Sequence, residues 1–211
     1  RDEAALSSVP SDSARCQLAA DFFPVTAGRR ARLEGWGCEQ LDLQKTNSHL
    51  AIDSECRTSM RNVWAIGDVS GEPMLAHRAM QQAKFAVERI FGGDDFAYNE
   101  DCIPSVVYSH PQIARVGYTQ KRAGEEGLSV EVVKSPYSAN IIARAELTGQ
   151  GFVKAVFHQN KLIGATIVGE DAAELIVPLA LIVSNQMTKK QLKGWVLPHP
   201  TLSEVFALLT G

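Results

Sequence analysis

The sequence has no pair of cysteines close enough to form a local redox disulfide or a zinc site. Its four cysteines, Cys16, Cys38, Cys56 and Cys102, are widely spaced and include no Cys-x-x-Cys. This spacing excludes short zinc-binding and dithiol motifs, and we predict no metal site. Scattered thiols without a secretory signal are typical of a reducing compartment, so we expect a cytoplasmic protein.

Several other features are missing. The longest apolar run, 175–183, contains Pro178 and falls well short of the ~20 residues of a membrane span. No Gly-x-Gly-x-x-Gly is present, which excludes a dinucleotide pyrophosphate loop of that type. The net charge is only −3, so the composition does not favour nucleic acid as a partner. The chain begins at Arg1 rather than Met, and we therefore expect an upstream part.

What is present is the composition of a globular protein. Hydrophobic residues make up 45% of the 211 residues, which is enough for one large domain or two small ones. Apolar residues recur at helical spacing from Ala76 to Ile90, and Gly92 and Gly93 end that pattern. The polar, glycine-rich stretch 92–101 then predicts a boundary, so we divide the chain into 1–98 and 99–211.

The two halves predict different elements. In the first half we expect a loop or tail at 1–20, a strand at 22–30, a buried strand at 63–68 and the helix at 76–90. In the second half we expect strands at 103–109, 129–134, 151–158 and 162–168, with a hairpin turn at 159–160. Helices are expected at 119–126, 171–185 (irregular at Pro178), 188–192 and 201–209. Strands grouped with helices predict an antiparallel α+β domain at the C-terminal end.

Gly67 and Asp68 follow the predicted strand and precede the helix. A carboxylate at the carboxyl end of a strand lies where α/β folds bind ligands, and it can accept hydrogen bonds from sugar hydroxyls. The N-terminus of the helix that follows would stabilise an electron-rich ligand. Taken alone, however, Gly-Asp is better explained as a plain turn.

The segment 197–204, Leu-Pro-His-Pro-Thr-Leu-Ser-Glu, also allows two interpretations. Thr201 and Glu204 have the spacing of a capping box for the last helix. Alternatively, Glu204 could orient His199 and raise its basicity, as general-base chemistry requires. Prolines on both sides of His199 restrict the backbone there, which suits a side chain that must be positioned.

Four stretches resemble the pyridine nucleotide–disulfide oxidoreductases. Residues 58–69 with 73–79 resemble the second flavin-binding motif of that family, 26–30 the Gly-Arg-Arg that ends its nicotinamide domain, and 103–117 the start of its interface domain. Residues 199–204 resemble the catalytic His-Pro-Thr-Leu-Ser-Glu of dihydrolipoamide dehydrogenases. The resemblance implies a C-terminal interface domain with an antiparallel sheet covered by helices, preceded by a partial α/β FAD/NAD-binding segment.

The resemblance also implies roles for particular residues. Asp68 would bind the ribityl chain of FAD. The backbone and helix start formed by Met74, Leu75, Ala76 and His77 would lie against the isoalloxazine. His199 would take a proton from a dihydrolipoamide thiol in the partner subunit's active site, and Glu204 would orient its ring.

The same resemblance implies cofactors and partners: FAD, NAD, a second copy of the chain, and the lipoyl domains of 2-oxoacid dehydrogenase or glycine cleavage complexes. The redox cysteine pair and the pyrophosphate loop of that family are absent here. We therefore expect a fragment of a dihydrolipoamide dehydrogenase that is inactive by itself. The alternatives are a non-catalytic dimerisation or interaction module, and part of a glutathione or mercuric reductase-like protein.

Some positions depart from the family pattern. Leu197 replaces a second histidine that often precedes the catalytic one, and Ala31 replaces a proline. His110 is better explained as a histidine bonded to backbone than as a second catalytic residue. The spacing before Arg144 is also unusual, so no role is assigned to that residue.

Overall fold

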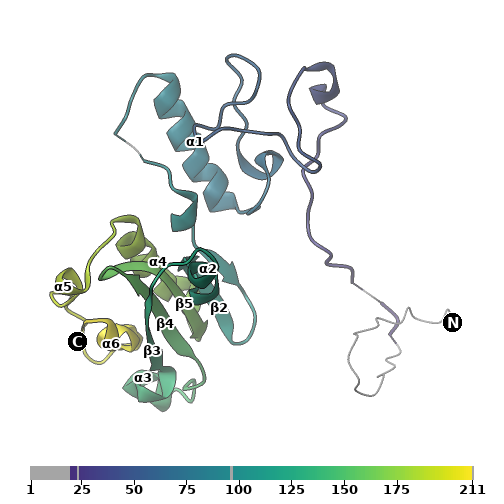
Figure 1. Cartoon of the computed structure of the whole chain (residues 1–211). Coiled ribbons are helices and arrows are strands. Elements are labelled where there is room, and N and C mark those ends of the chain that lie inside the picture. The colour runs from purple at the N-terminus through teal and green to yellow at the C-terminus, as the bar shows by residue number, and fades with distance from the viewer. Residues whose placement is uncertain (1–19, 23, 96, 211) are drawn as a thin grey trace.

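The computed structural model describes residues 20–22, 24–95 and 97–210 (Figure 1). The loop or tail predicted for 1–20 therefore falls, except for Ala20, outside the described residues. The first half contains two short 3-10 helices, η1 (Cys38–Gln40) and η2 (Gly67–Ser70), followed by the long helix α1 (Ala76–Ile90). In Figure 1, α1 lies above the sheet of the second half. The helix predicted for 76–90 is thus confirmed.

Two predicted strands of the first half are wrong. Residues 24–30 form no strand, and in place of the strand at 63–68 there is a single bridge between Arg57 and Trp64, followed by η2. The local pattern was apolar, but a strand is stable only when a neighbouring strand satisfies its backbone groups. Within the described part of the first half, the segment 63–68 finds only that one bridge.

Five antiparallel strands form the sheet of the second half in the order β1-β2-β5-β4-β3. The strands are β1 (Ser105–Val107), β2 (Gln112–Gly117), β3 (Glu131–Pro136), β4 (Phe152–His158) and β5 (Lys161–Gly169). The helices are η3 (Glu100–Cys102), α2 (Gln120–Glu125), η4 (Tyr137–Ala139), α3 (Ile141–Ala145), α4 (Ala172–Ser184), α5 (Lys189–Leu192), η5 (Leu202–Phe206) and α6 (Ala207–Thr210). The predicted α+β domain is confirmed.

One face of this sheet carries the core. Ile167 of β5 is paired with Ala114 of β2 and with Val153 of β4, so these side chains point to the same side, and all three are fully buried. Residues of α4, η5 and α6 pack on them. Burial of this apolar face is the main source of stability for the domain. It also fixes the C-terminal segment, because Val205 and Phe206 are part of the core.

Several local predictions of the second half are confirmed. Gln159 and Asn160 both have positive φ, as a two-residue hairpin turn between β4 and β5 requires. The Thr119 hydroxyl caps α2 by accepting the N–H of Arg122 at 3.1 Å. Helix α4 forms where a helix was expected, but it continues through Pro178, where the sequence predicted an irregularity.

Other parts of the second half differ from the prediction. Strand β2 and helix α3 were not predicted as separate elements, and the last predicted helix, 201–209, begins as the 3-10 helix η5. No helix in the described part of the chain is long and apolar enough to cross a membrane.

Candidate functional site

The His199 ring is held by the carboxylate of Glu204. Nδ1 of His199 lies 3.0 Å from one carboxylate oxygen and 3.2 Å from the other. Because an ionised carboxylate only accepts hydrogen bonds, the proton of a neutral ring sits on Nδ1 and the lone pair on Nε2. The His199 side chain is 70% exposed, and Nε2 has no hydrogen-bond partner within the described residues. This arrangement leaves a base nitrogen open to a substrate.

Glu204 has a second hydrogen-bond donor. The backbone N–H of Thr201 donates to its Oε2 at 3.0 Å, as the capping box predicts. The Thr201 N–H and, to a lesser extent, the His199 ring lower the pKa of the Glu204 carboxyl below its ordinary value. The carboxylate therefore caps η5 and orients the ring at the same time, so the two interpretations of the sequence do not exclude each other.

Core packing places the segment that carries this pair. Phe206, fully buried, stacks on Trp195 with ring centroids 5.3 Å apart. On the other side of the segment, Asn140 at the start of α3 donates from its amide to the carbonyls of Thr201 (3.0 Å) and Leu202 (3.3 Å). The sequence prediction did not include Asn140, because a contact across 61 residues leaves no local pattern.

The loop that carries Asp68 is closely fitted to α1. Gly67 has φ +72, and a Cβ there would lie 3.1 Å from the Cβ of Ala79. The hydroxyl of Ser70 donates to the Gly67 carbonyl at 2.7 Å. The backbone angle thus favours glycine, and the approach of the helix leaves little room for a side chain. The carboxylate of Asp68 is 44% exposed and forms an ion pair with Arg29 at 3.5 Å.

Met74, Leu75, Ala76 and His77 form the start of α1. Leu75 is the N-cap and supplies no side-chain bond, and the N–H groups of Ala76 and His77 have no acceptor within the described residues. Met74 is buried, and its N–H donates to Glu72 at 3.1 Å. The positive end of α1 therefore remains available to an electron-rich group.

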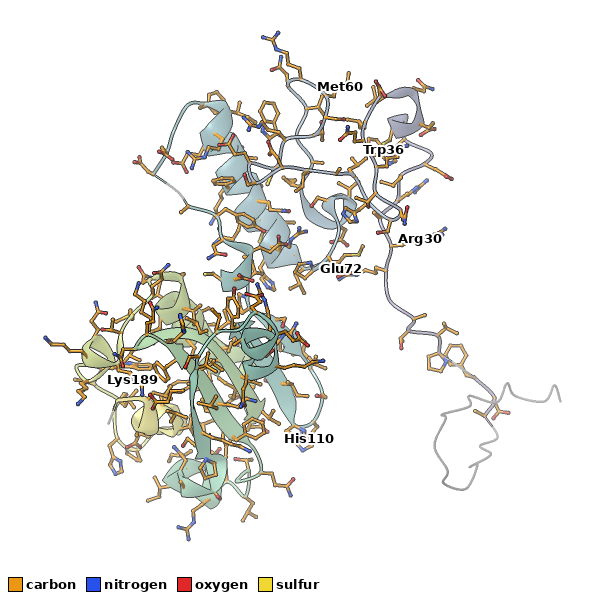
Figure 2. The ribbon with its side chains drawn as sticks, viewed as in Figure 1. Arg30, Trp36, Met60, Glu72, His110 and Lys189 are labelled. Carbon is orange, nitrogen blue, oxygen red and sulfur yellow. The ribbon has the colours of Figure 1, made fainter. Side chains whose placement is uncertain are left out.

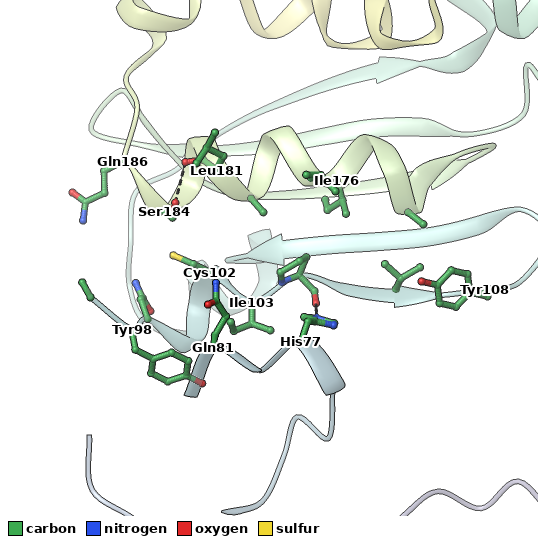
Figure 3. Close-up of a pocket in the computed structure, with 17 residues that line it drawn as sticks. His77, Gln81, Tyr98, Cys102, Ile103, Tyr108, Ile176, Leu181, Ser184 and Gln186 are labelled. Carbon is green, nitrogen blue, oxygen red and sulfur yellow. Dashed lines mark hydrogen bonds between the residues drawn. The ribbon is translucent and has the colours of Figure 1, made fainter. Parts of the chain in front are cut away.

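His77 lies differently from the other residues of this group. Its Nε2 is 2.6 Å from the carbonyl oxygen of Pro104, which lies just before β1 (Figure 3). The ring thus links α1 to the sheet domain. Its Nε2 is therefore occupied by a backbone carbonyl.

Two buried residues of α1, which the sequence prediction missed, hold the Asp68 loop. Gln82 accepts the N–H of Gly67 at 2.8 Å, and Arg78 donates to the carbonyl of Gly71 at 3.0 Å. The Nε of Arg78 also bonds to Glu100 of η3 at 2.6 Å. Arg78 and Gln82 are four residues apart and so share one helix face. No signal in the sequence indicated this role, because the apolar pattern of α1 falls on other positions, such as Met80 and Val87, which are exposed.

The predicted residues form two separate groups. Within the described residues, no hydrogen bond or ion pair joins the Asp68 loop to His199 or Glu204. His110 is exposed at the tip of the hairpin between β1 and β2 (Figure 2), and no carboxylate there pairs with it. Arg144 is exposed in α3. Among the described residues, no cluster of His, Cys, Asp or Glu could hold a metal ion.

A cavity of about 720 Å³ lies between α1 and α4. His77 and Gln81 line one side, and Ile176 and Leu181 line the other (Figure 3). Neither Asp68 nor His199 contributes to its wall. The cavity is therefore distinct from both groups of predicted site residues.

The family of the chain follows from comparison with known proteins. Residues 103–209 match the dimerisation domain of the pyridine nucleotide-disulphide oxidoreductases, and residues 2–83 match a second model of the pyridine nucleotide-disulphide oxidoreductases. The chain belongs to this family of oxidoreductases.

Among the proteins with similar sequences are dihydrolipoyl dehydrogenases from several organisms. The chain is 39% identical to that of Geobacillus stearothermophilus over 189 residues, which are 88% of this chain and 40% of the relative. It is 37% identical to that of Pseudomonas aeruginosa over 190 residues, which are 89% of this chain and 41% of the relative. The chain thus spans about two fifths of the length of these relatives.

The chain is also similar to a solved structure. LpdA from Mycobacterium tuberculosis superposes with a TM-score of 0.80 at 27% identity, covering 88% of this chain and 40% of that chain.

Proposed function

We propose that this chain contributes the dimerisation domain and an acid–base pair, His199 and Glu204, to a flavoprotein dihydrolipoamide dehydrogenase. The observation that carries the proposal is the geometry of the pair: Nδ1 of His199 is held by both oxygens of Glu204 while the ring is 70% exposed. Such a ring is fixed in one tautomer and accessible to a substrate, as a general base must be.

The proposed step is a proton transfer from a dihydrolipoamide thiol. Nε2 of His199 accepts the proton, and the thiol becomes a thiolate that can attack a redox disulfide. Glu204 stabilises the imidazolium that results, because its carboxylate is already ionised and bonded to Nδ1. The same nitrogen returns the proton when the cycle reverses. The disulfide belongs to a part of the enzyme outside these 211 residues, in which no close cysteine pair exists.

The residues around Asp68 fit FAD. An exposed carboxylate can accept a bond from a ribityl hydroxyl, and the uncapped start of α1 can stabilise negative charge on the flavin ring. The glycine at position 67 keeps the loop close to the helix. We therefore assign FAD contacts to Asp68 and to the backbone of Met74, Leu75, Ala76 and His77. When bound, FAD supplies the two-electron carrier between the disulfide and NAD.

The organisation of the chain follows from the same proposal. Residues 1–98 belong to the NAD- and FAD-binding domains, and residues 99–211 form the dimerisation domain. The partners are a second copy of the chain and the lipoyl domains of 2-oxoacid dehydrogenase or glycine cleavage complexes. The three free cysteines of the described residues, Cys38, Cys56 and Cys102, support a cytoplasmic location.

The test is to purify the protein that carries this chain and to compare three activities. We expect bound FAD with its yellow absorbance, and reduction of NAD by dihydrolipoamide. Preferential reduction of glutathione disulfide or mercuric ion would assign the protein to a related reductase instead. A dimer with neither flavin nor turnover would make it a non-catalytic interaction module.

A further inference from the structure

Asn140 is a buried polar side chain to which the proposed reaction assigns no role. Only 5% of the residue is exposed, although it carries two donors and an acceptor. Its Oδ1 accepts the N–H of Ala143 at 3.0 Å and so caps α3. Its Nδ2 donates to the carbonyl oxygens of Thr201 and Leu202. All of its hydrogen-bonding capacity is directed at two backbone segments.

Only one orientation of this amide satisfies its surroundings. Two carbonyl oxygens accept but cannot donate, so the side facing Thr201 and Leu202 must be the NH₂ group. The other side faces an N–H, which needs the amide oxygen. A side chain with a single acceptor could cap α3, but only an amide can also bind the C-terminal segment.

A continuous series of hydrogen bonds connects Asn140 to the base. Asn140 donates to the Thr201 carbonyl, the Thr201 N–H donates to Glu204 Oε2, and Glu204 accepts from His199 Nδ1. The Thr201 hydroxyl additionally donates to the Pro198 carbonyl at 2.7 Å. Thr201 is therefore fixed through its carbonyl, its N–H and its hydroxyl.

The exposure of the residues along this series shows where its rigidity comes from. The His199 side chain is largely exposed and Glu204 is 26% exposed, so neither is held by tight packing. Asn140 is the buried member, and it bonds to the backbone that carries Glu204. Burial makes such bonds persistent, because breaking them would leave polar groups without partners.

We propose that Asn140 is a positioning residue for the His199–Glu204 pair: it fixes the backbone of Thr201, which in turn fixes the Glu204 carboxylate and the His199 ring. This inference rests on the proposed function for its kinetic consequence. Its structural consequence can be measured without activity, because the hydrogen bonds of Asn140 should make the backbone of segment 197–206 more rigid.

The experiment compares Asn140→Ser with Thr119→Ala in the full enzyme. Serine can still cap α3, but its hydroxyl is too short to reach the carbonyls of Thr201 and Leu202. Thr119→Ala removes a helix cap of the same domain at α2, far from the pair in sequence, and controls for simple loss of a cap. Asn140→Asp is the second variant, because it keeps the shape and the acceptor but cannot donate when ionised.

Hydrogen–deuterium exchange in 197–206 should rise at least about fivefold in Asn140→Ser, with β4 unchanged. The kcat for dihydrolipoamide should fall at least about fivefold, with KM within about twofold and FAD content unchanged. Asn140→Asp should show the same changes, and Thr119→Ala neither.

The results separate the two proposals. A parent enzyme with no dihydrolipoamide activity contradicts the proposed function, and exchange in 197–206 then decides the role of Asn140. Exchange that rises by less than about fivefold, or equally in β4, overturns the inference. If the parent is active, an unchanged kcat in a folded Asn140→Ser or Asn140→Asp variant also overturns the inference.

Discussion

The carboxylate of Glu204 accepts hydrogen bonds from a backbone N–H and from an imidazole. The Thr201 N–H fixes the carboxylate at the start of η5, and the carboxylate then fixes the His199 ring. The same hydrogen bond that caps η5 therefore also holds Glu204 in the position from which it orients His199. The Leu202–Phe206 turn is short, so this cap stabilises it together with the burial of Val205 and Phe206.

The charge of Glu204 should stabilise the fold in a pH-dependent way. Its folded pKa is lowered, so its contribution is fully present above the ordinary value of 4.5 and is lost as the pH falls through the lower folded value. Glu204→Gln keeps the size and one acceptor oxygen but removes the charge. We expect the variant to unfold at lower urea than the parent at about pH 7, with a difference that is smaller at about pH 3. A difference that stays constant between these pH values would contradict this prediction.

At the scale of single residues, the contact between His199 and Glu204 could be predicted from the sequence, but the residues that hold this pair and the Asp68 loop in place could not. His199 and Glu204 are five positions apart and lie in one motif. Asn140 and Thr201 are 61 positions apart, and Arg78 and Glu100 are 22 apart. Contacts of this kind depend on the fold as a whole, so a single sequence gives no local pattern from which to predict them.

Among the secondary-structure elements, those with a local cause were predicted correctly. Helix α1 forms where the apolar spacing predicted it, although Met80 and Val87 of that pattern are exposed and a different face is buried. Helix α2 follows from the Thr119 cap, and the hairpin from Gln159 and Asn160. The predicted strand at 63–68 failed because strand formation depends on a partner elsewhere. Strand β2 was missed because the prediction ended the strand at 109, whereas the chain folds back at the exposed His110 and continues as a second strand.

The pairing of β2 with β5 depends on glycine at position 164. Gly164 faces Gly117 across the two strands, and a Cβ at 164 would overlap the backbone of Tyr118. Gly164→Ala should therefore destabilise the domain by about 3 kcal/mol, the upper range for overpacking. The matched control is Gly124→Ala in α2, where a Cβ meets nothing within 4 Å.

Urea unfolding of both glycine variants measures the effect. The control should be neutral or more stable by up to about 1 kcal/mol, because alanine favours a helix. Equal stability of Gly164→Ala and the parent would show that the strands can separate at this point without cost, contrary to the structure.

For the whole molecule, the important feature is the separation of the two groups of site residues. The Asp68 loop is hydrogen-bonded to α1, whereas His199 belongs to the C-terminal segment that packs on the core of the sheet domain. A base that is exposed and separate from the flavin residues of its own chain is what the proposed action on a partner subunit requires. The family match of 103–209 to a dimerisation domain supports this arrangement.

The most direct test of the account is the turnover of His199→Gln in the complete enzyme, with His110→Gln as control. Loss of the base should reduce NAD-dependent oxidation of dihydrolipoamide by about a hundredfold or more, with FAD still bound. The control removes an exposed histidine that no described carboxylate orients, and it should retain parent activity. Parent-level turnover in His199→Gln would contradict the central claim that His199 and Glu204 perform the acid–base step.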